Sequence, residues 1–234
     1  MMRAVAFHGL VYATMGVMGI VGAPFVLWRE AWTRAWQKRF CRAVFWFLNR
    51  LYGVTIEVRG AVPTGDVIIA AKHQSMLDVL ILYNALPRAR FVMKRSLLWM
   101  PAFGLYAWRT GAVSIDRRPG SGATEKMLEA FTDAPGQIVV YPQGTRVAPG
   151  ASAPYRRGVA RLAKATGRGV IPVGTNSGFF WRRGGTMTGP GTAVIAFGDP
   201  LNGPGTRGDL MAEIERCVEA CSDALAHQII SKRG

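Results

Sequence analysis

The sequence predicts an α/β fold, with a mixed, mostly parallel sheet flanked by helices and a two-helix segment at the N-terminus. Short runs rich in Val and Ile recur after Gly53, and helical patterns lie between them. This alternation is typical of parallel or mixed sheets with helices on their faces. Before Gly53 the chain has one long apolar run and then a stretch of aromatic and basic residues. We therefore divide it into an N-terminal helical segment, residues 1–52, and an α/β domain, residues 53–234.

Seven apolar runs predict the strands of the sheet: Val54–Val58, Val67–Ala71, Arg90–Met93, Ala112–Ile115, Gln137–Tyr141, Val170–Val173 and Ala193–Phe197. Helical spacing predicts helices around Ser75–Leu86, Thr124–Thr132 and Arg156–Thr166, and an amphipathic closing helix from Asp209 to Ile230. The Gly- and Pro-rich segments Pro149–Pro154 and Gly184–Gly191 are interpreted as surface loops.

The first 52 residues favour contact with a membrane. From Ala4 to Trp28 there is no Asp, Glu, Lys or Arg, and the run is long enough to cross a bilayer as a helix, although Pro24 can bend or end it. In the next stretch large apolar residues recur every four positions beside a parallel row of cations, as in helices that lie among lipid headgroups. The apolar positions are Trp28, Trp32, Trp36, Phe40 and Val44, and the cations are Arg34, Lys38 and Arg42. A helix that packs on a core through one face is the alternative; the neighbouring apolar run favours the membrane.

The distribution of charge predicts a cytoplasmic position for the rest of the chain. A secretory signal peptide also begins with a cation and an apolar run. Here only Arg3 precedes the run, whereas Arg29, Arg34, Lys38, Arg39 and Arg42 follow it, which favours the cytoplasmic side. The cysteines Cys41, Cys217 and Cys221 form neither a disulfide framework nor a zinc-ligand pattern, which fits a reducing compartment. We expect the cytoplasmic membrane, with the α/β domain on its cytoplasmic face; a spanning and a re-entrant first helix both remain open.

The chain is strongly basic, with 29 Lys and Arg against 14 Asp and Glu and a formal net charge of +15. Such a field attracts nucleic acid, anionic lipid, phosphorylated substrates or an acidic carrier protein. The cations are not arranged as in RNP-like or helix-turn-helix motifs, and the apolar N-terminus fits a nucleic-acid-binding protein badly. We therefore expect no nucleic-acid partner.

A histidine and an aspartate follow the second predicted strand. The segment Lys72-His73 comes directly after Val67–Ala71, where open α/β sheets place their ligand crevices. If His73 lies in the turn before the next helix, Asp78 can reach back to one imidazole nitrogen, which leaves the other free to take a proton from a hydroxyl. Alternatively, Ser75 and Asp78 form a helix capping box and His73 is an ordinary loop residue. The other histidines, His8 and His227, lie in the apolar run and the tail helix, so His73 alone is placed for catalysis.

A second polar segment follows the fifth predicted strand. Pro142 and Gly144 suit a tight turn, which is the simplest explanation of the segment. A turn of this kind also presents backbone amides, and Thr145 and Arg146 add a hydroxyl and a forked cation, a set that suits a phosphate monoester. Lys94 and Arg117 each follow a predicted strand and can converge on the same crevice.

At these residues the sequence resembles the glycerolipid acyltransferases, in particular bacterial 1-acyl-sn-glycerol-3-phosphate acyltransferases. Four motif blocks occur in the family's order between Gly53 and Pro200, about two thirds of the chain. They are HQSMLD at His73–Asp78; Lys94 to Leu97, then Pro101, Gly104, Gly111 and SIDR ending at Arg117; PQGTR at Pro142–Arg146; and Val170–Val173 followed by Asn176-Ser177-Gly178.

The resemblance implies a direct acyl transfer to a lysophospholipid. His73 would be the general base on the acceptor hydroxyl, with Asp78 orienting it, and the acceptor oxygen would attack the thioester of acyl-CoA or acyl-carrier protein. The acceptor phosphate would be bound by Lys94, Arg117, Gly144, Thr145 and Arg146. The resemblance implies no cofactor, no metal and no cysteine nucleophile. It also implies membrane lipids as partners, paired N-terminal helices in the membrane and an apolar tunnel for the acyl chain.

Two residues depart from the family's pattern. Gln143 replaces a glutamate, so any role that needs that carboxylate is in question, although phosphate binding can gain from losing an anion. Lys72 replaces the more usual Asn before the histidine, where a cation either disfavours a protonated imidazole or attracts an acidic donor.

Another lysolipid, such as lyso-ornithine lipid, is the alternative acceptor. A catalytically dead scaffold is disfavoured by the presence of His73 and Asp78.

Overall fold

The computed structural model describes residues 2–26, 28–100, 103–115, 122–201 and 209–233. In these ranges the strands form one sheet in the order β1-β7-β6-β2-β5-β3-β4, and neighbours run parallel except for the antiparallel pair β6 and β7. The strands are β1 Val54–Arg59, β2 Ile68–Ala71, β3 Ala89–Lys94, β4 Val113–Ile115, β5 Gln137–Val140, β6 Val170–Thr175 and β7 Gly191–Phe197. The predicted mixed, mostly parallel sheet is confirmed.

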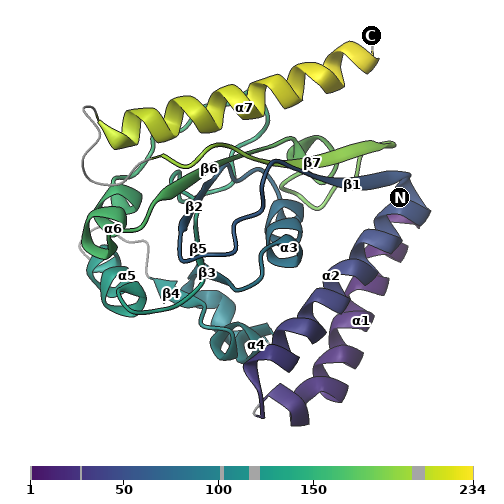
Figure 1. Ribbon diagram of the computed structural model, residues 1–234. Coiled ribbons are helices and arrows are strands. Elements are labelled where there is room, and N and C mark those ends of the chain that lie inside the picture. The colour runs from purple at the N-terminus through teal and green to yellow at the C-terminus, as the bar shows by residue number, and fades with distance from the viewer. Residues whose placement is uncertain (1, 27, 101–102, 116–121, 202–208, 234) are drawn as a thin grey trace.

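Helices cover both faces of this sheet (Figure 1). They are α1 Met2–Val26, α2 Glu30–Tyr52, α3 Met76–Ala85, α4 Phe103–Arg109, α5 Ala123–Phe131, α6 Gly158–Thr166 and α7 Leu210–Arg233, with short 3-10 helices η1 Arg95–Trp99 and η2 Ser177–Phe179. α2 ends where Gly53 adopts a left-handed conformation, with φ 68° and its amide bonded to Asn49 O. Glycine adopts this conformation at little cost, so the end of α2 at this position has a local cause.

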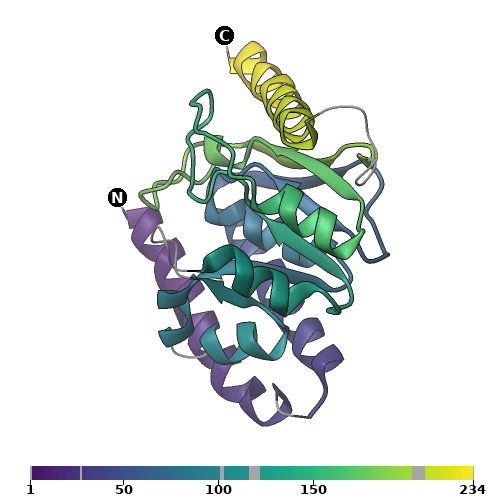
Figure 2. The same cartoon turned by 90° about the vertical axis from the view of Figure 1, so that its left-hand side faces the viewer.

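The alternation of side chains along the strands divides the core into two layers. On β2, Ile69 and Ala71 pack with side chains of α2 and α3, whereas Ile68 and Ala70 pack with those of α5, α6 and α7. Successive residues of a strand point to opposite faces, so this division follows directly from the pleat. Figures 1 and 2 show α7 lying across one side of the sheet, with α2 and α3 on the other.

All seven predicted strands and the four predicted helices of the α/β domain are present, with ends that differ by up to three residues. The sequence reasoning missed η1, α4 and η2. These elements have three to seven residues, too few for apolar periodicity to be distinguished from chance.

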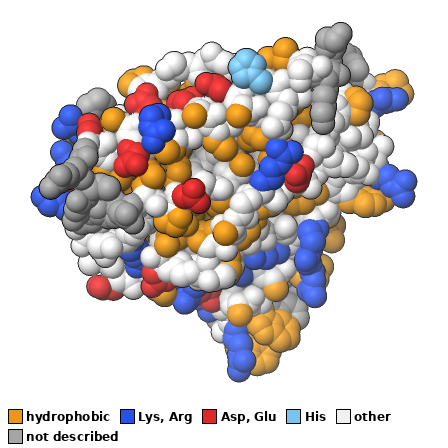
Figure 3. All heavy atoms as spheres, turned by 45° about the horizontal axis from the view of Figure 1, so that its top comes forward, with side chains coloured by type: hydrophobic (Ala, Val, Ile, Leu, Met, Phe, Trp, Pro, Cys, Tyr) orange, Lys and Arg blue, Asp and Glu red, His pale blue; other side chains and the backbone are white. Residues whose placement is uncertain are grey.

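The antiparallel helices α1 and α2 extend beyond the end of the sheet (Figure 1). α1 is long and apolar enough to cross a membrane, and only 6% of its most apolar stretch is buried. Exposed apolar side chains include Tyr12 and Ile20 on α1, and Trp28 and Trp32 around the turn to α2. Figure 3 shows hydrophobic side chains gathered with Lys and Arg at the projecting tip of the molecule.

The interpretation of the cations of α2 as one headgroup-facing row is wrong for two of the three. Arg34 is only 7% exposed and donates to Ala89 O and Thr110 O, each at 2.7 Å. Lys38 is half-buried and donates to Leu86 O at 2.8 Å. These carbonyls lie at the edges of α3, β3 and α4, where regular structure leaves acceptors without intrahelical or interstrand donors. The two side chains are turned inward because they satisfy these acceptors.

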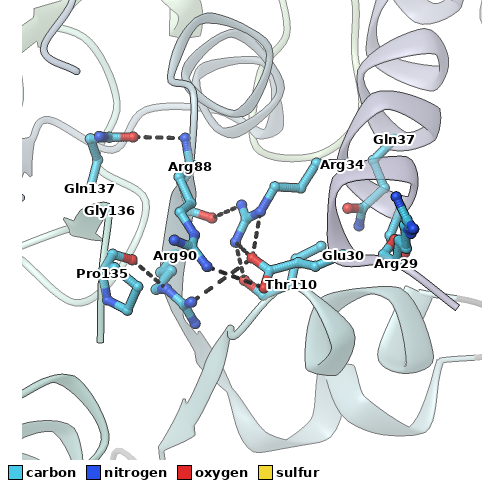
Figure 4. Close-up of polar contacts among 12 residues, drawn as sticks. Arg29, Glu30, Arg34, Gln37, Arg88, Arg90, Thr110, Pro135, Gly136 and Gln137 are labelled. Atoms are coloured by element: carbon cyan, nitrogen blue, oxygen red, sulfur yellow. Dashed lines mark hydrogen bonds and ion pairs between the residues drawn. The ribbon is translucent and has the colours of Figure 1, made fainter. Parts of the chain in front are cut away.

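A glutamate completes this network (Figure 4). Glu30 accepts a hydrogen bond from Arg34 Nε at 2.8 Å and also lies 3.5 Å from Arg88 and 3.9 Å from Arg90. Burial raises the pKa of Glu30, but the hydrogen bonds and charges of Arg34 and Arg88 outweigh burial and hold it below its usual value. The network fastens the start of α2 to the sheet and to the end of α4.

We predict that Arg34→Ala lowers the free energy of unfolding by about 3 to 5 kcal/mol, because it leaves two buried carbonyls without their donor and removes from Glu30 its nearest cation. Chemical denaturation in detergent, followed by circular dichroism, measures this change. The control is Arg42→Ala, at an exposed position of the same helix, for which we expect a change within about 0.5 kcal/mol. Equal effects of the two substitutions would show that the network does not stabilise the fold.

Candidate active site

The order of the strands brings the predicted site residues to one edge of the sheet. β2, β5, β3 and β4 are successive parallel neighbours, so their carboxyl ends lie side by side. His73 follows β2, the turn with Thr145 and Arg146 follows β5, and Lys94 ends β3. Arg117, which follows β4 in the sequence, lies outside the described residues. The edge that they share is where α/β sheets of this kind bind ligands.

His73 and Asp78 are in contact. His73 Nδ1 lies 2.9 Å from Asp78 Oδ1, and the imidazole is 13% exposed whereas the carboxyl group is fully buried. A carboxylate only accepts hydrogen bonds, so Nδ1 carries the proton of this contact. The neutral imidazole then has its lone pair on Nε2, as a general base requires.

The two interpretations of this segment turn out to be compatible. Asp78 Oδ2 accepts the backbone amides of Ser75 at 2.6 Å and Gln74 at 2.9 Å, and Ser75 Oγ accepts the amide of Leu77, so the predicted capping box is present. Asp78 thus caps α3 through one oxygen and binds the imidazole through the other. Ser177 Oγ on η2 also donates to Oδ2 at 3.2 Å. Ser177 belongs to the fourth motif block of the sequence, but its contact with Asp78 was not predicted.

An aromatic ring fixes the plane of the imidazole. Tyr141 stacks on His73 with 4.0 Å between ring centroids and 20° between planes. Burial, followed by the negative charge of Asp78, raises the pKa of Tyr141 well above its usual value, so the phenol stays neutral. Its hydroxyl has no hydrogen bond of normal geometry among the described residues.

The turn after β5 uses part of its backbone internally. Gly144, at φ 69°, donates its amide to Tyr141 O at 2.9 Å, which corrects the expectation that this amide is presented to a ligand. Val147 donates its amide to His73 O at 2.8 Å and so ties the turn to the segment that bears the histidine. The groups of the turn that remain for a ligand include the exposed Thr145 and the partly exposed Arg146.

A cavity of about 750 Å³ connects these groups. His73, Lys94, Thr145 and Arg146 line it together with Gly144. Its other walls are largely apolar and come from α1 to α4 and β3, including Met18, Phe40, Leu80, Phe91, Met93 and Tyr106. Its size and apolar walls are typical of binding sites for small ligands with long apolar parts.

Two further arginines lie near these groups. Arg183 lines the same cavity, and the guanidinium of Arg156 lies beside the Cα of Gly144. The sequence reasoning assigned neither to the site, because Arg156 falls at the start of the predicted helix Arg156–Thr166 and Arg183 does not directly follow a predicted strand. Arg183 is adjacent to the predicted Gly-rich loop, whose position relative to the sheet only the fold determines.

Cys41 also lines the cavity. Burial raises the pKa of this thiol to about 12. The thiol is therefore protonated at neutral pH, and a protonated thiol is a poor nucleophile. Among the described residues no group of three or more His, Cys, Asp or Glu is placed to hold a metal ion.

The two residues that depart from the family's pattern point away from this cavity toward α7. Lys72 is 2% exposed and its ammonium pairs with Glu219 at 2.6 Å. The interpretation that Lys72 attracts an acidic donor is therefore wrong, because the ammonium is buried and paired. Gln143 is 4% exposed and also contacts Glu219.

The chain matches known proteins in sequence and in fold. A family model described as Acyltransferase matches residues 54–176. The chain is 28% identical to the 1-acyl-sn-glycerol-3-phosphate acyltransferase of Pseudomonas aeruginosa, over 93% of this chain and 88% of that protein. It is 32% identical to the mouse 1-acyl-sn-glycerol-3-phosphate acyltransferase alpha, over 77% of this chain and 64% of that protein.

Among solved structures, the crystal structure of the 1-acyl-sn-glycerophosphate acyltransferase PlsC from Thermotoga maritima matches with a TM-score of 0.80 and 20% identity, over 96% of this chain and 97% of that one. This likeness concerns the fold, which includes the helical pair as well as the sheet. The sequence match to the Pseudomonas protein extends beyond the motif-bearing region, and the family model covers more than half of the chain, including both members of the His73–Asp78 pair. The protein is thus a member of the acyltransferase family.

Proposed function

We propose that the protein transfers a fatty acyl group from acyl-CoA or acyl-carrier protein to the sn-2 hydroxyl of 1-acylglycerol-3-phosphate and so forms phosphatidate. The observation that carries this proposal is the His73–Asp78 pair, which lies in a largely apolar cavity with Lys94 and Arg146 in the same lining. A base, cations for a phosphate and room for an acyl chain are the three parts that the reaction needs.

The base acts through its free nitrogen. His73 Nε2 removes the proton of the sn-2 hydroxyl as the oxygen attacks the carbonyl carbon of the thioester. The imidazolium that forms is stabilised by Asp78, whose carboxylate is held by three donors besides the ring. When the tetrahedral intermediate collapses, the C–S bond breaks and the imidazolium returns the proton to the thiolate. The products are phosphatidate and free thiol, and His73 is again neutral.

The acceptor phosphate is proposed to bind at the carboxyl ends of β3 and β5. Lys94 supplies a point charge, Arg146 a forked pair of donors and Thr145 a hydroxyl, and all three line the cavity with His73. Gly144 contributes close approach of the backbone because it has no side chain. Arg117 belongs to the same proposal by its position after β4.

The acyl chain is proposed to occupy the apolar part of the cavity between α1, α2, α3 and β3. Because the Cys41 thiol in this cavity has a pKa of about 12, attack by the acceptor hydroxyl itself is favoured over an acyl-enzyme intermediate. The proposed reaction needs no cofactor beyond the acyl donor.

Membrane lipids are proposed as partners, with the catalytic domain on the cytoplasmic face of the cytoplasmic membrane. α1 is apolar and little buried, and Trp28 and Trp32, at the turn to α2, are 77% and 60% exposed. Tryptophan favours the membrane–water interface. Trp108 on α4 is also exposed, and its neighbour Arg109 donates to Val26 O at the end of α1, so these aromatic residues gather at one end of the molecule.

We predict phosphatidate formation from labelled oleoyl-CoA and lysophosphatidate by the purified wild-type protein. His73→Ala is expected to lower kcat by about 10²- to 10⁴-fold, the usual contribution of a general base.

Arg146→Ala is expected to raise the KM for lysophosphatidate and to change the KM for lyso-ornithine lipid little, because the latter carries no phosphate. Parallel assays with acyl-carrier protein in place of oleoyl-CoA show which of the two acyl donors the protein uses. Transfer to lyso-ornithine lipid alone would replace the acceptor, and equal activity of His73→Ala and wild type would refute the mechanism.

We further predict that the protein stays in the membrane fraction when membranes are washed at about 1 M salt, where the screening length falls to about 3 Å and ionic attachment is lost. The physical reason is that α1 contributes apolar surface rather than charge. Centrifugation and immunoblotting measure the partition, and extraction with detergent is the positive control. Release by salt alone would show that attachment is electrostatic and that α1 does not enter the bilayer.

A further inference from the structure

Glu219, on α7, links the two positions at which the chain departs from the family's motifs. Its Oε1 accepts hydrogen bonds from Lys72 Nζ at 2.7 Å, Gln143 Nε2 at 3.3 Å and Tyr155 OH at 2.8 Å. Its Oε2 accepts a second bond from Lys72 at 2.6 Å. No described residue of α7 lines the cavity, and residue 219 lies outside the range of the family match. Any influence of Glu219 on the site therefore has to pass through the residues that it binds.

The first of these residues, Lys72, directly follows β2 and directly precedes His73. On β2 the side chains of Ile68 and Ala70 face α7, and those of Ile69 and Ala71 face α3. The contacts of the next two residues continue this alternation, with Lys72 bonded to α7 and His73 lining the cavity. Because Lys72 directly precedes His73, the position of the Lys72 side chain constrains the backbone of the turn that carries His73.

The second residue, Gln143, lies in the 142–146 turn that is proposed to bind the phosphate. Gln143 directly precedes Gly144, Thr145 and Arg146, and its side chain is bonded to Glu219 and to Ala153 O. Glu219 thus contacts the residue before each of the two functional segments, 147 positions downstream of Lys72 in the chain.

The charges around Glu219 explain why position 143 holds an amide. The Lys72 ammonium is 2% exposed, and an unpaired buried ammonium is costly, so it needs one counter-ion. Glu219 supplies that carboxylate. A glutamate at 143 would place a second carboxylate beside the first, and among the described partners of Glu219, Lys72 is the one cation. Burial and the hydrogen bond to Glu219 raise the pKa of Tyr155, which keeps its phenol a donor to the same oxygen.

We propose that Glu219 is a positioning residue, which supplies from α7 the carboxylate that the family's third motif carries at position 143 and thereby holds the end of β2 and the 142–146 turn in register. This inference rests on the acceptor-binding role proposed above for Thr145 and Arg146. It assigns to α7 a function in acceptor binding, although the helix lies on the opposite face of the sheet from the cavity.

The experiment that tests this proposal moves the carboxylate from one side of the contact to the other. Glu219→Gln removes the counter-ion of Lys72, and Gln143→Glu adds a second carboxylate. Each single variant is expected to lower kcat/KM for lysophosphatidate by roughly tenfold to a hundredfold, chiefly through a higher acceptor KM. Glu219→Gln removes the charged acceptor of the Lys72 hydrogen bonds, and Gln143→Glu places two carboxylates that repel each other side by side. The double variant keeps one carboxylate, one amide and Lys72, and its kcat/KM is expected to return to within about threefold of wild type.

The control is Asp223→Asn, which removes an exposed carboxylate one turn further along α7 and is expected to leave all kinetic constants unchanged. Thermal unfolding in detergent confirms that each variant is folded. Losses that multiply in the double variant, or losses that fall on kcat with an unchanged acceptor KM, would overturn the proposal. Arg146→Ala, assayed alongside, tests the phosphate-binding role separately. An unchanged acceptor KM in this variant contradicts that role, whereas the recovery of kcat/KM in the double variant tests only the contact between Glu219 and position 143.

Discussion

The site depends on one buried carboxylate. Asp78 accepts four hydrogen bonds, from the imidazole of His73, the amides of Gln74 and Ser75 and the hydroxyl of Ser177. These donors come from the turn after β2 and from η2, while Asp78 itself lies in the first turn of α3, so the carboxylate joins three segments and also fixes the tautomer of His73. A fully buried carboxylate is tolerated only where such donors compensate it. The same carboxylate that caps α3 therefore holds the imidazole of His73 in position.

Around this carboxylate the strand order assembles the rest of the site. Because β2, β5 and β3 are adjacent and parallel, the segments that follow them share one edge, although they are distant in sequence. The helical pair then encloses the apolar part of the cavity, since α1 and α2 line it together with α3 and β3. The Arg34–Glu30 network fastens α2 in that position. The proposed chemistry, the proposed acceptor binding and the proposed acyl-chain site thus depend on different interactions within one fold.

Much of this arrangement could be predicted from the sequence, because alternation along strands and motif spacing are local properties. The His73–Asp78 contact needs only five residues and a turn. Long-range partners could not be predicted. The row of cations on α2 does not indicate which carbonyls will lack donors, so Arg34 was wrongly placed toward lipid. Nor does local pattern reveal that one carboxylate on α7 binds both Lys72 and Gln143.

The most direct test of the central claim, that Asp78 orients His73 as the base, is the kcat of Asp78→Asn measured beside its free energy of unfolding. An amide of the same shape cannot accept all of these bonds, so we predict a fall in kcat of about 10²- to 10⁴-fold. Ser75→Ala, which removes the cap hydroxyl without touching His73, should lower the free energy of unfolding by about 0.5 to 2 kcal/mol and leave kcat nearly unchanged. If Asp78→Asn retained the kcat of the wild-type protein, the carboxylate would be a helix cap alone and the proposed mechanism would be contradicted.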